Sequence, residues 1–283
     1  MKSKSIILQF IIIATFTTYA MGQQIQMPQA SPTATISQKI GLTDVNIEYS
    51  RPSTKGRKIF GELVPFGEVW RTGANAATII NFKNEAKVEG NLVPAGSYAL
   101  YSIPGKTEWT IILSKNTKLW GAVGYDTKDD LVRFKVKPSK TAQKYETMEI
   151  NFIDMTDTGA TISLIWENTK IKFRIETEVD SIVMAEIKAL VIDKEAENPG
   201  LLYQAANYYF TNNKDMNQAY DWITKSVSED PKYWTMHLKA KIELDLGKKK
   251  EAIDSATKSM EMANEAKNFD YVGLNERLIK SIK

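Results

Sequence analysis

Basic and aromatic side chains alternate through residues 48–82, and they are the residues of this chain best suited to bind a ligand. An arginine guanidinium is a planar fork that can bind a carboxylate or a phosphate through two hydrogen bonds. Arg51, Arg57 and Arg71 could therefore hold an anionic group. Trp70 could stack on a planar ligand, and Asn75, in the turn Thr-Gly-Ala-Asn, could orient a ligand oxygen.

The same arginines could instead stabilise the fold, because ion-pair networks are common in folded domains. Glycines and prolines divide the stretch into short turns, whose carbonyl groups also need hydrogen-bond donors. Three acidic residues are available for pairing: Glu48, Glu62 and Glu68. The sequence leaves a ligand site and a structural network as alternatives.

A second candidate site is an aromatic platform for a sugar ring. Trp120 lies in the sequence Lys-Leu-Trp-Gly-Ala-Val-Gly-Tyr-Asp, whose two glycines indicate a loop, so we expect its ring to be exposed. Tyr98 and Tyr101 fall on opposite faces of a strand, so at least one of them is expected in a core. Trp109 and Tyr125 complete the set, although most aromatic residues of a sandwich belong to its core.

The sequence offers few residues that could bind a metal ion or act as a nucleophile. The chain has no cysteine and a single histidine, His237, which excludes thiolate sites and histidine-rich zinc sites. Asp126, Asp129 and Asp130 are clustered, but they lack the spacing of an EF-hand loop and Lys128 interrupts them, so we predict a solvated turn and no metal site. No nucleotide-binding or serine-hydrolase motif is present, and we predict no cofactor.

Acid–base catalysis remains an alternative to simple binding. It would need two carboxylates, a serine–lysine pair, or a tyrosine and a lysine acting as acid and base. Glu48, Glu68 and Asp126 are the candidate carboxylates. The sequence assigns no catalytic residue among them.

Apolar residues alternate with a period of two from residue 34 to residue 176, as they do in half-buried antiparallel strands. The alternating sets are Val132, Phe134 and Val136; Met148, Ile150 and Phe152; Ile162, Leu164 and Trp166; and Ile171, Phe173 and Ile175. Turn residues separate the runs at 89–91, 94–96, 104–106, 157–159 and 167–169. Many short strands at this spacing predict an antiparallel β-sandwich or barrel.

The period changes near residue 177, and the rest of the chain predicts helices. Asp180 could cap a helix that ends before Pro199-Gly200. Two later segments align one repeat apart, at Ala206 and Ala240, Ala219 and Ala252, Ile223 and Ala256, and Ser226 and Ser259. This pattern resembles tetratricopeptide repeats, whose helix pairs recur every ~34 residues with small residues where the helices cross. A plain helical bundle is the alternative, and with either one the fold class is α+β.

The N-terminus indicates export. Lys2 and Lys4 precede an apolar run over residues 6–16, and Ala20 and Gly22 follow it, which is the pattern of a secretory signal peptide cleaved either before Gln23 or after Ala20. The run is shorter than the about 20 residues that span a membrane. Because no cysteine can carry a lipid, we expect a soluble periplasmic or secreted protein, and the formal charge of +3 does not suggest a nucleic-acid binder. We predict a signal peptide over 1–22, a β domain over 28–176, a linking helix over 177–198 and helical repeats over 199–283.

Most of residues 28–176 resembles the family called domain of unknown function 2911, which is found in exported bacterial proteins. The segments that carry the resemblance are SRPSTKGRKIFGELVPFGEVWRTGANAATIINF, LVPAGSYALYSIPGKTEWTIILSK, LWGAVGYD and SLIWENTKIKFRIE. The family elements are matched here by Arg51, Arg57, Trp70, Arg71, Asn75 and Trp120. The resemblance implies a secreted β-rich domain, sometimes followed by helical repeats, and no catalytic roles come with it.

The sequence therefore predicts a binding module of the cell envelope, with a basic-aromatic pocket for an anionic or carbohydrate-like ligand and a helical tail for a protein partner. One alternative is a hydrolase or other acid–base enzyme that acts on an envelope sugar or ester. The other is a pure protein-interaction scaffold, in which the β domain is only a rigid mount.

Overall fold

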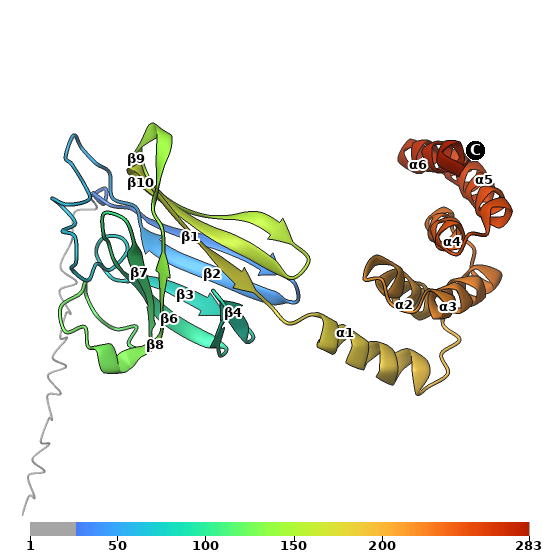
Figure 1. Ribbon diagram of the computed structural model, residues 1–283, viewed down its shortest axis with the longest axis horizontal. Coiled ribbons are helices and arrows are strands. Elements are labelled where there is room, and N and C mark those ends of the chain that lie inside the picture. Colours follow the sequence, from blue (N-terminus) through green and yellow to red (C-terminus); the bar gives the residue numbers. More distant parts are fainter. Residues whose placement is uncertain (1–26, 283) are drawn as a thin grey trace, which may run out of the picture.

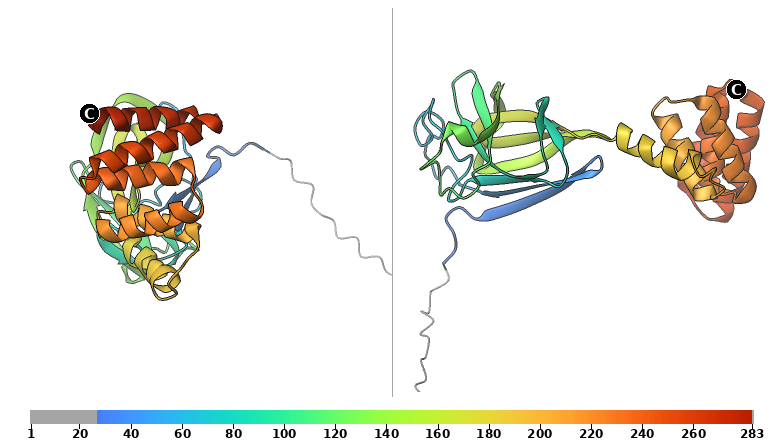
Figure 2. Two further views of the ribbon diagram at one scale, coloured as in Figure 1. Left: turned by 90° about the vertical axis from the view of Figure 1, so that its right-hand side faces the viewer. Right: turned by 90° about the horizontal axis from the view of Figure 1, so that it is seen from below.

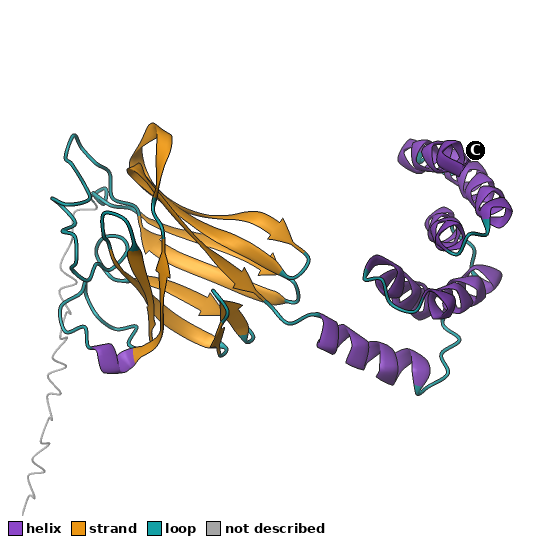
Figure 3. Cartoon of the chain, in the orientation of Figure 1, coloured by secondary structure: helices purple, strands orange, loops and turns teal. Residues whose placement is uncertain are grey.

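The computed structural model describes residues 27–282, in which strands come first and helices follow (Figure 1). Figure 3 shows the division between the strand-rich and the helical part by colour. The predicted signal peptide lies outside the described residues. Within them, no helix has the length and apolar character needed to cross a membrane.

The strands form two antiparallel sheets that pack face to face (Figure 1). The six-stranded sheet has, in spatial order, β1 (Thr33–Ile40), β2 (Thr43–Ser50), β3 (Thr78–Phe82), β6 (Gly96–Ile103), β7 (Trp109–Ser114) and β8 (Asp130–Val136). The four-stranded sheet has β5 (Asn91–Val93), β4 (Ala86–Val88), β10 (Gly159–Glu176) and β9 (Ser139–Thr156). Both sheets are open, so the domain is a sandwich and not a closed barrel. The predicted α+β class is confirmed.

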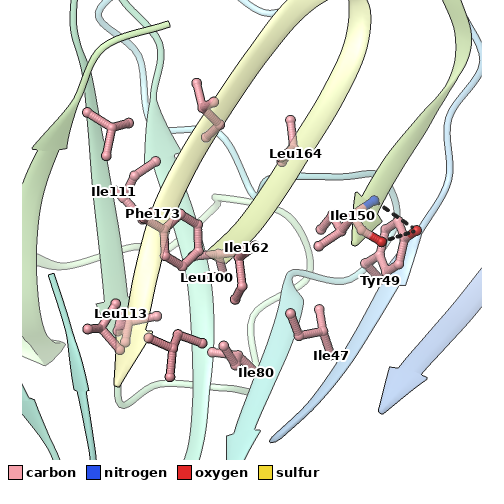
Figure 4. Close-up of a cluster of buried hydrophobic side chains, with 14 of the residues drawn as sticks. Ile47, Tyr49, Ile80, Leu100, Ile111, Leu113, Ile150, Ile162, Leu164 and Phe173 are labelled. Atoms are coloured by element: carbon pink, nitrogen blue, oxygen red, sulfur yellow. Dashed lines mark hydrogen bonds between the residues drawn. The ribbon is translucent and has the colours of Figure 1, made fainter. Parts of the chain in front are cut away.

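The main core lies between the sheets and follows from the alternation seen in the sequence (Figure 4). Ile47 and Ile80 of the six-stranded sheet are buried against residues such as Ile162 of the opposite sheet. Tyr49 adds a polar link between the sheets, because its hydroxyl accepts a hydrogen bond from the Ile150 backbone N–H at 3.0 Å. The two sheets are therefore joined by apolar packing and by a buried tyrosine.

One predicted turn is wrong. Residues 167–169 were expected to separate two strands, but β10 continues through them as a single strand of 18 residues. Its pairing with β9 shifts register on both sides of Glu167, whose φ of 54° marks a bulge. A bulge accommodates turn-forming residues while the ladder continues on either side.

A smaller core covers the outer face of the six-stranded sheet. Its buried residues are Ala77, Ala99, Tyr101 and Ile112. The loop between β7 and β8 crosses this face and packs Leu119, Ala122 and Tyr125 onto it. That loop ends in the 3₁₀ turn η1 (Thr127–Asp129). The loop between β7 and β8 thus covers the outer face of the six-stranded sheet, and this packing fixes the position of the loop.

The second part of the chain is all-helical, as predicted. It contains α1 (Asp180–Ile187), which continues as the π-helical η2 (Lys188–Ile192), and then α2 (Pro199–Thr211), α3 (Met216–Glu229), α4 (Tyr233–Asp245), α5 (Lys249–Glu265) and α6 (Phe269–Ile282). Figure 2 shows α2 to α6 stacked on one another. The small residues aligned in the sequence, from Ala206 to Ser259, are all buried.

Two hydrogen bonds recur in the successive helix pairs. Ser226 of α3 donates to the carbonyl of Pro199, the first residue of α2, at 2.8 Å. Ser259 of α5 donates to the carbonyl of Tyr233, the first residue of α4, at 2.6 Å. The pairs α2–α3 and α4–α5 therefore repeat a contact as well as a pattern of residue types.

The expected cap of the linking helix is wrong, whereas the helix does end before Pro199-Gly200, as expected. Asp180 is the first residue of α1 and not its cap, and its carboxylate accepts hydrogen bonds from Tyr208 and Lys214 at 2.8 and 2.9 Å. Pro199-Gly200 begins α2, and Asn198 caps it by accepting from the Leu201 N–H. Proline suits the first turn of a helix because its missing N–H would have no partner there.

Candidate functional site

Arg51 and Arg57 lie at the side of the sandwich where the loop after β2 meets β9. Arg51 donates from Nε to the Met148 carbonyl at 3.1 Å, and its Nη2 is 3.6 Å from the Glu149 carboxylate. Arg57 donates to the carbonyls of Thr54 and Ser53 at 2.9 and 2.8 Å. These contacts are those of the structural network that the sequence left open, because the guanidinium groups satisfy backbone carbonyls.

Trp70 belongs to the main core. Its side chain is 8% exposed, and its indole N–H donates to the Gly73 carbonyl at 3.0 Å. Its ring is stacked on Trp166 at 6.0 Å and meets the edges of Phe60 and Trp109. This burial leaves little of the ring for stacking on a ligand from solvent.

Arg71 and Asn75 together shape the loop that leads into β3. The Arg71 Nη1 donates to the carbonyl of Asn75 at 2.8 Å. Asn75 has a φ of 59°, a left-handed conformation that asparagine tolerates better than most residues. Its side-chain amide donates to the Ser31 carbonyl and the Ser50 hydroxyl, both at 3.2 Å, so it connects the segment before β1 to the end of β2.

Trp120 projects into solvent and is 70% exposed. The loop that carries it packs on the smaller core. The next residue, Gly121, accepts a hydrogen bond from the Tyr101 hydroxyl at 3.3 Å. Gly121 also lies against Arg71, since a Cβ at this glycine would be 2.7 Å from the guanidinium Nη1. The exposed indole is thus mounted on a loop that the smaller core and Arg71 position.

A hollow of about 410 Å³ lies beside Trp120, at the end of the six-stranded sheet. The residues that line it are Gln29, Ala30, Ser31, Thr33, Glu48, Tyr49, Ser50, Asn75, Ala76, Ala77 and Trp120. Of the six predicted site residues, Asn75 and Trp120 line this hollow, and Arg71 supports both of their loops. Arg51, Arg57 and Trp70 are absent from its described lining.

Glu48 also lines the hollow. The sequence alone left its role open, because Glu48 was a candidate both for ion pairing and for acid–base chemistry. It lies on β2 between Thr35 of β1 and Ile79 of β3. The alternation of β2 buries Ile47 and Tyr49, and so places Glu48 on the outer face. Among the described residues that line the hollow, Glu48 alone carries a charge.

The three aspartates near Trp120 each have a different partner. Asp126 accepts from the Lys128 backbone N–H, which lowers the pKa of Asp126 together with the Lys128 ammonium. Asp129 accepts from the Asn116 amide at 3.2 Å. Asp130 accepts from the Tyr125 hydroxyl at 2.7 Å, and burial raises the pKa of both groups. Residues 27–282 contain no cluster of acidic or histidine side chains that could hold a metal ion.

His237 has a partner that sequence reasoning missed. Its Nδ1 is 2.8 Å from Oδ1 of Asn275, which is fully buried on α6. The Asn275 amide nitrogen donates to the Tyr271 carbonyl and to Ser259, both at 2.8 Å, so its oxygen faces His237 and the histidine Nδ1 is the donor. His237 is a partly exposed residue of α4, and its partner could not be found from neighbouring residues because Asn275 lies 38 positions later in the chain.

An apolar hollow of about 340 Å³ lies between α1, η2 and α2. Its lining includes Val183, Ile187, Leu190, Leu201 and Tyr208. Leu190 remains 40% exposed there. This hollow lies on the helical part of the chain, and none of its lining residues belongs to the Trp120 hollow.

The model of the family described as protein of unknown function (DUF2911) matches residues 31–175, just over half of the chain. The chain belongs to this family. The DUF2911 match ends within β10, one residue before the strand does, so it covers the sandwich and excludes the helices. It contains Glu48, Asn75 and Trp120, and therefore most of the hollow beside Trp120. No curated protein and no solved structure matches the chain.

Proposed function

We propose that this protein is an exported binding module of the cell envelope, periplasmic or secreted, that holds a small ligand in the hollow beside Trp120. The observation that carries the proposal is an indole 70% exposed over a polar hollow, on a loop held by Arg71 and Tyr101. An aromatic ring on a loop that is already held in place can bind a ligand at a lower entropy cost than a ring on a flexible loop. Export is supported by the signal-peptide pattern at the N-terminus.

The proposal gives new roles to the predicted site residues. Trp120 and Asn75 remain ligand contacts, and Glu48 joins them. Arg71 is a positioning residue, because its hydrogen bond goes to the Asn75 carbonyl and its guanidinium lies under Gly121. Arg51 and Arg57 support the loop after β2, and Trp70 supports the core.

Binding is favoured over hydrolysis by the make-up of the same hollow. Glycoside hydrolysis takes two carboxyl groups about 5–10 Å apart across one cleft. Glu48 is the one carboxylate among the described lining residues, while Asp126 binds Lys128 and Glu68 is not part of the described lining. A glutamate alone can orient a ligand without cleaving it.

The ligand proposal is tested by thermal unfolding of the purified protein with a panel of glycans, phosphorylated compounds and carboxylated compounds. A ligand present at 100 times its Kd stabilises the native state by about 2.7 kcal/mol, which raises Tm by several degrees. We expect at least one hit that Trp120→Ala removes and Val123→Ala retains. Val123 is the matched control because it is 85% exposed on the same loop and outside the described lining of the hollow. Hits that survive Trp120→Ala would place binding elsewhere.

The helical region is proposed to bind a protein partner as a tetratricopeptide-like array. Support comes from Tyr203, His237 and Tyr271, which recur one repeat of about 34 residues apart on α2, α4 and α6. The rings of His237 and Tyr271 are 5.5 Å apart, and the Lys241 ammonium lies 4.7 Å above the ring of Phe210. A row of aromatic and basic side chains suits an acidic peptide.

The partner proposal is tested by chemical crosslinking in cells that express Lys241→Glu or Lys258→Glu. Lys258 is an exposed residue of α5 and serves as the charge-matched control. Loss of the crosslinked partner in Lys241→Glu alone is the expected result. Equal crosslinking in both variants would argue that the helices only mount or extend the sandwich.

A further inference from the structure

We infer that the ligand of the hollow beside Trp120 is a neutral carbohydrate, with one pyranose ring stacked on the indole of Trp120 and its hydroxyl groups bound by Glu48 and the neighbouring polar residues. This inference rests on the proposed function and names the chemical class of the ligand. Three features of the hollow support this class of ligand: the charge of its lining, its hydrogen-bonding groups and the loop that carries Trp120.

The charge of the hollow argues against an anionic ligand. Glu48 is the one charged side chain among the described residues that line it. The nearest predicted anion binder, Arg71, directs Nη1 to the Asn75 carbonyl, and Arg51 lies beside Met148 and Glu149 of β9. A phosphate or carboxylate in this hollow would meet a like charge, and no cationic side chain belongs to the described lining.

The remaining polar groups match hydroxyl groups. Gln29, Ser31, Thr33, Ser50 and Asn75 bring amide and hydroxyl side chains to the lining. The Asn75 amide nitrogen already donates to the Ser31 carbonyl and the Ser50 hydroxyl, so Asn75 would meet a ligand through its side-chain oxygen. Hydroxyl and amide side chains both donate and accept hydrogen bonds, as the hydroxyl groups of a sugar do. A carboxylate adds a strong acceptor that can bind two neighbouring hydroxyl groups. The set resembles a hydrogen-bonding surface for a polyol more than a pocket for an apolar molecule.

The mounting of Trp120 supplies the apolar part of such a site. One face of a pyranose ring carries mainly C–H groups, and an aromatic ring covers that face without losing hydrogen bonds. The Tyr101 bond to the Gly121 carbonyl and the contact of Arg71 with Gly121 hold the loop before any ligand arrives. A preformed platform lowers the entropy cost of binding, which matters most for weak, hydrated ligands such as sugars.

An organic cation is the competing ligand class, because an indole and a carboxylate together also bind ammonium groups. The two classes respond differently at Glu48. A cation depends on the negative charge, whereas a sugar hydroxyl can also bind the amide of glutamine. Glu48→Gln therefore separates them.

The experiment is a glycan microarray with the purified protein, followed by calorimetric titration of the best oligosaccharide, choline chloride and sodium phosphate into four proteins. These are the wild type, Trp120→Ala, Glu48→Gln and the control Val123→Ala. We expect an uncharged oligosaccharide to bind, with a Kd that rises at least about tenfold in Trp120→Ala, corresponding to about 1.4 kcal/mol. We expect a rise of less than tenfold in Glu48→Gln and no change in Val123→Ala.

Two results would overturn the inference in different ways. Choline or phosphate bound in a Trp120-dependent manner, with no oligosaccharide bound more tightly than about 1 mM, would keep the binding site and refute the carbohydrate class. Oligosaccharide binding that is unchanged in Trp120→Ala, or no binding of any probe, would refute the proposed hollow itself. The conservative variant Trp120→Phe keeps a stacking ring and should retain part of the affinity, whereas a merely structural role of Trp120 would show as a lowered Tm in both variants.

Discussion

The Arg71 guanidinium donates a hydrogen bond from Nη1 to the carbonyl of Asn75 at 2.8 Å, and the same nitrogen would be 2.7 Å from a Cβ placed on Gly121 in another loop. Arg71 thereby joins the loop before β3 to the loop that carries Trp120. The two predicted ligand contacts, Asn75 and Trp120, come from these two loops. An arginine that looked like an anion binder in the sequence is the connection between the parts of the hollow.

Gly121→Ala is expected to weaken this connection, and Gly124→Ala provides its control. Both glycines have a left-handed φ, 78° and 82°, so both substitutions carry the same conformational cost of about 1–2 kcal/mol. Only at Gly121 does the new Cβ meet Arg71, and displacing the guanidinium breaks its bond to Asn75. We expect Gly121→Ala to lower the free energy of unfolding by about 1 kcal/mol more than Gly124→Ala, measured by urea denaturation.

The same comparison in an Arg71→Ala background checks the cause. Without the guanidinium the two alanine variants should lose equal stability, because the specific contact is gone. A difference that persists in this background would assign the cost to another neighbour of Gly121.

Tyr49→Phe should destabilise the sandwich, because β9 is an edge strand and Tyr49 satisfies its Ile150 N–H at 3.0 Å. Removing the hydroxyl leaves a buried donor without a partner, which costs about 1–3 kcal/mol. Tyr98→Phe is the matched control. The Tyr98 hydroxyl donates to the carbonyl of Pro94, only four residues away in the chain, so this hydrogen bond does not join the two sheets. If the two variants lose equal free energy of unfolding in urea denaturation, the hydrogen bond between the sheets does not stabilise the protein more than a local one.

Ser259→Ala should cost more stability than Ser226→Ala, although the two serines occupy equivalent places in α3 and α5. Ser226→Ala removes one hydrogen bond, to Pro199, and should cost about 0.5–1.5 kcal/mol. Ser259→Ala also leaves the buried amide of Asn275 without one of its acceptors, so its cost should reach about 1–3 kcal/mol. Circular dichroism at the helix band during thermal unfolding measures both, and a reversed order would contradict the proposed network.

His237 should make the helical region sensitive to mild acid. Burial lowers the pKa of His237 below its usual 6.5, and the hydrogen bond to Asn275 offsets only part of that effect. The unfolded chain therefore takes up a proton first as the pH falls. Stability is full above about pH 6.5, declines as the pH drops toward the folded pKa, and then levels off.

His237→Asn keeps a donor for Asn275 and removes the titration. We expect the Tm of the helical unfolding step to fall between pH 7.5 and pH 5 in the wild type by more than in this variant. Parallel pH profiles of the two proteins would show that other groups cause the dependence.

The alternation of residues in the sequence was enough to predict the sandwich core. Val132, Phe134 and Val136 face the core as expected, and so do Ile162 and its alternating neighbours. Side-chain direction in a strand depends only on local backbone geometry, so a period of two survives any choice of strand order. The predicted turn at 167–169 was wrong because a bulge exists only in relation to a partner strand, and Glu167 pairs with Tyr145 of β9, which local residue types do not reveal.

The sequence by itself also determined which residue types were available for a site: a tryptophan followed by two glycines, an asparagine in a tight turn, three arginines and one histidine. Only the tertiary structure decided their roles. It buried Trp70 among Phe60, Trp109 and Trp166, directed the arginines to backbone carbonyls, and brought Glu48 to the same hollow as Asn75 and Trp120. Such roles depend on which loops meet across two sheets, and that is set by long-range strand pairing and packing, which local residue patterns do not encode.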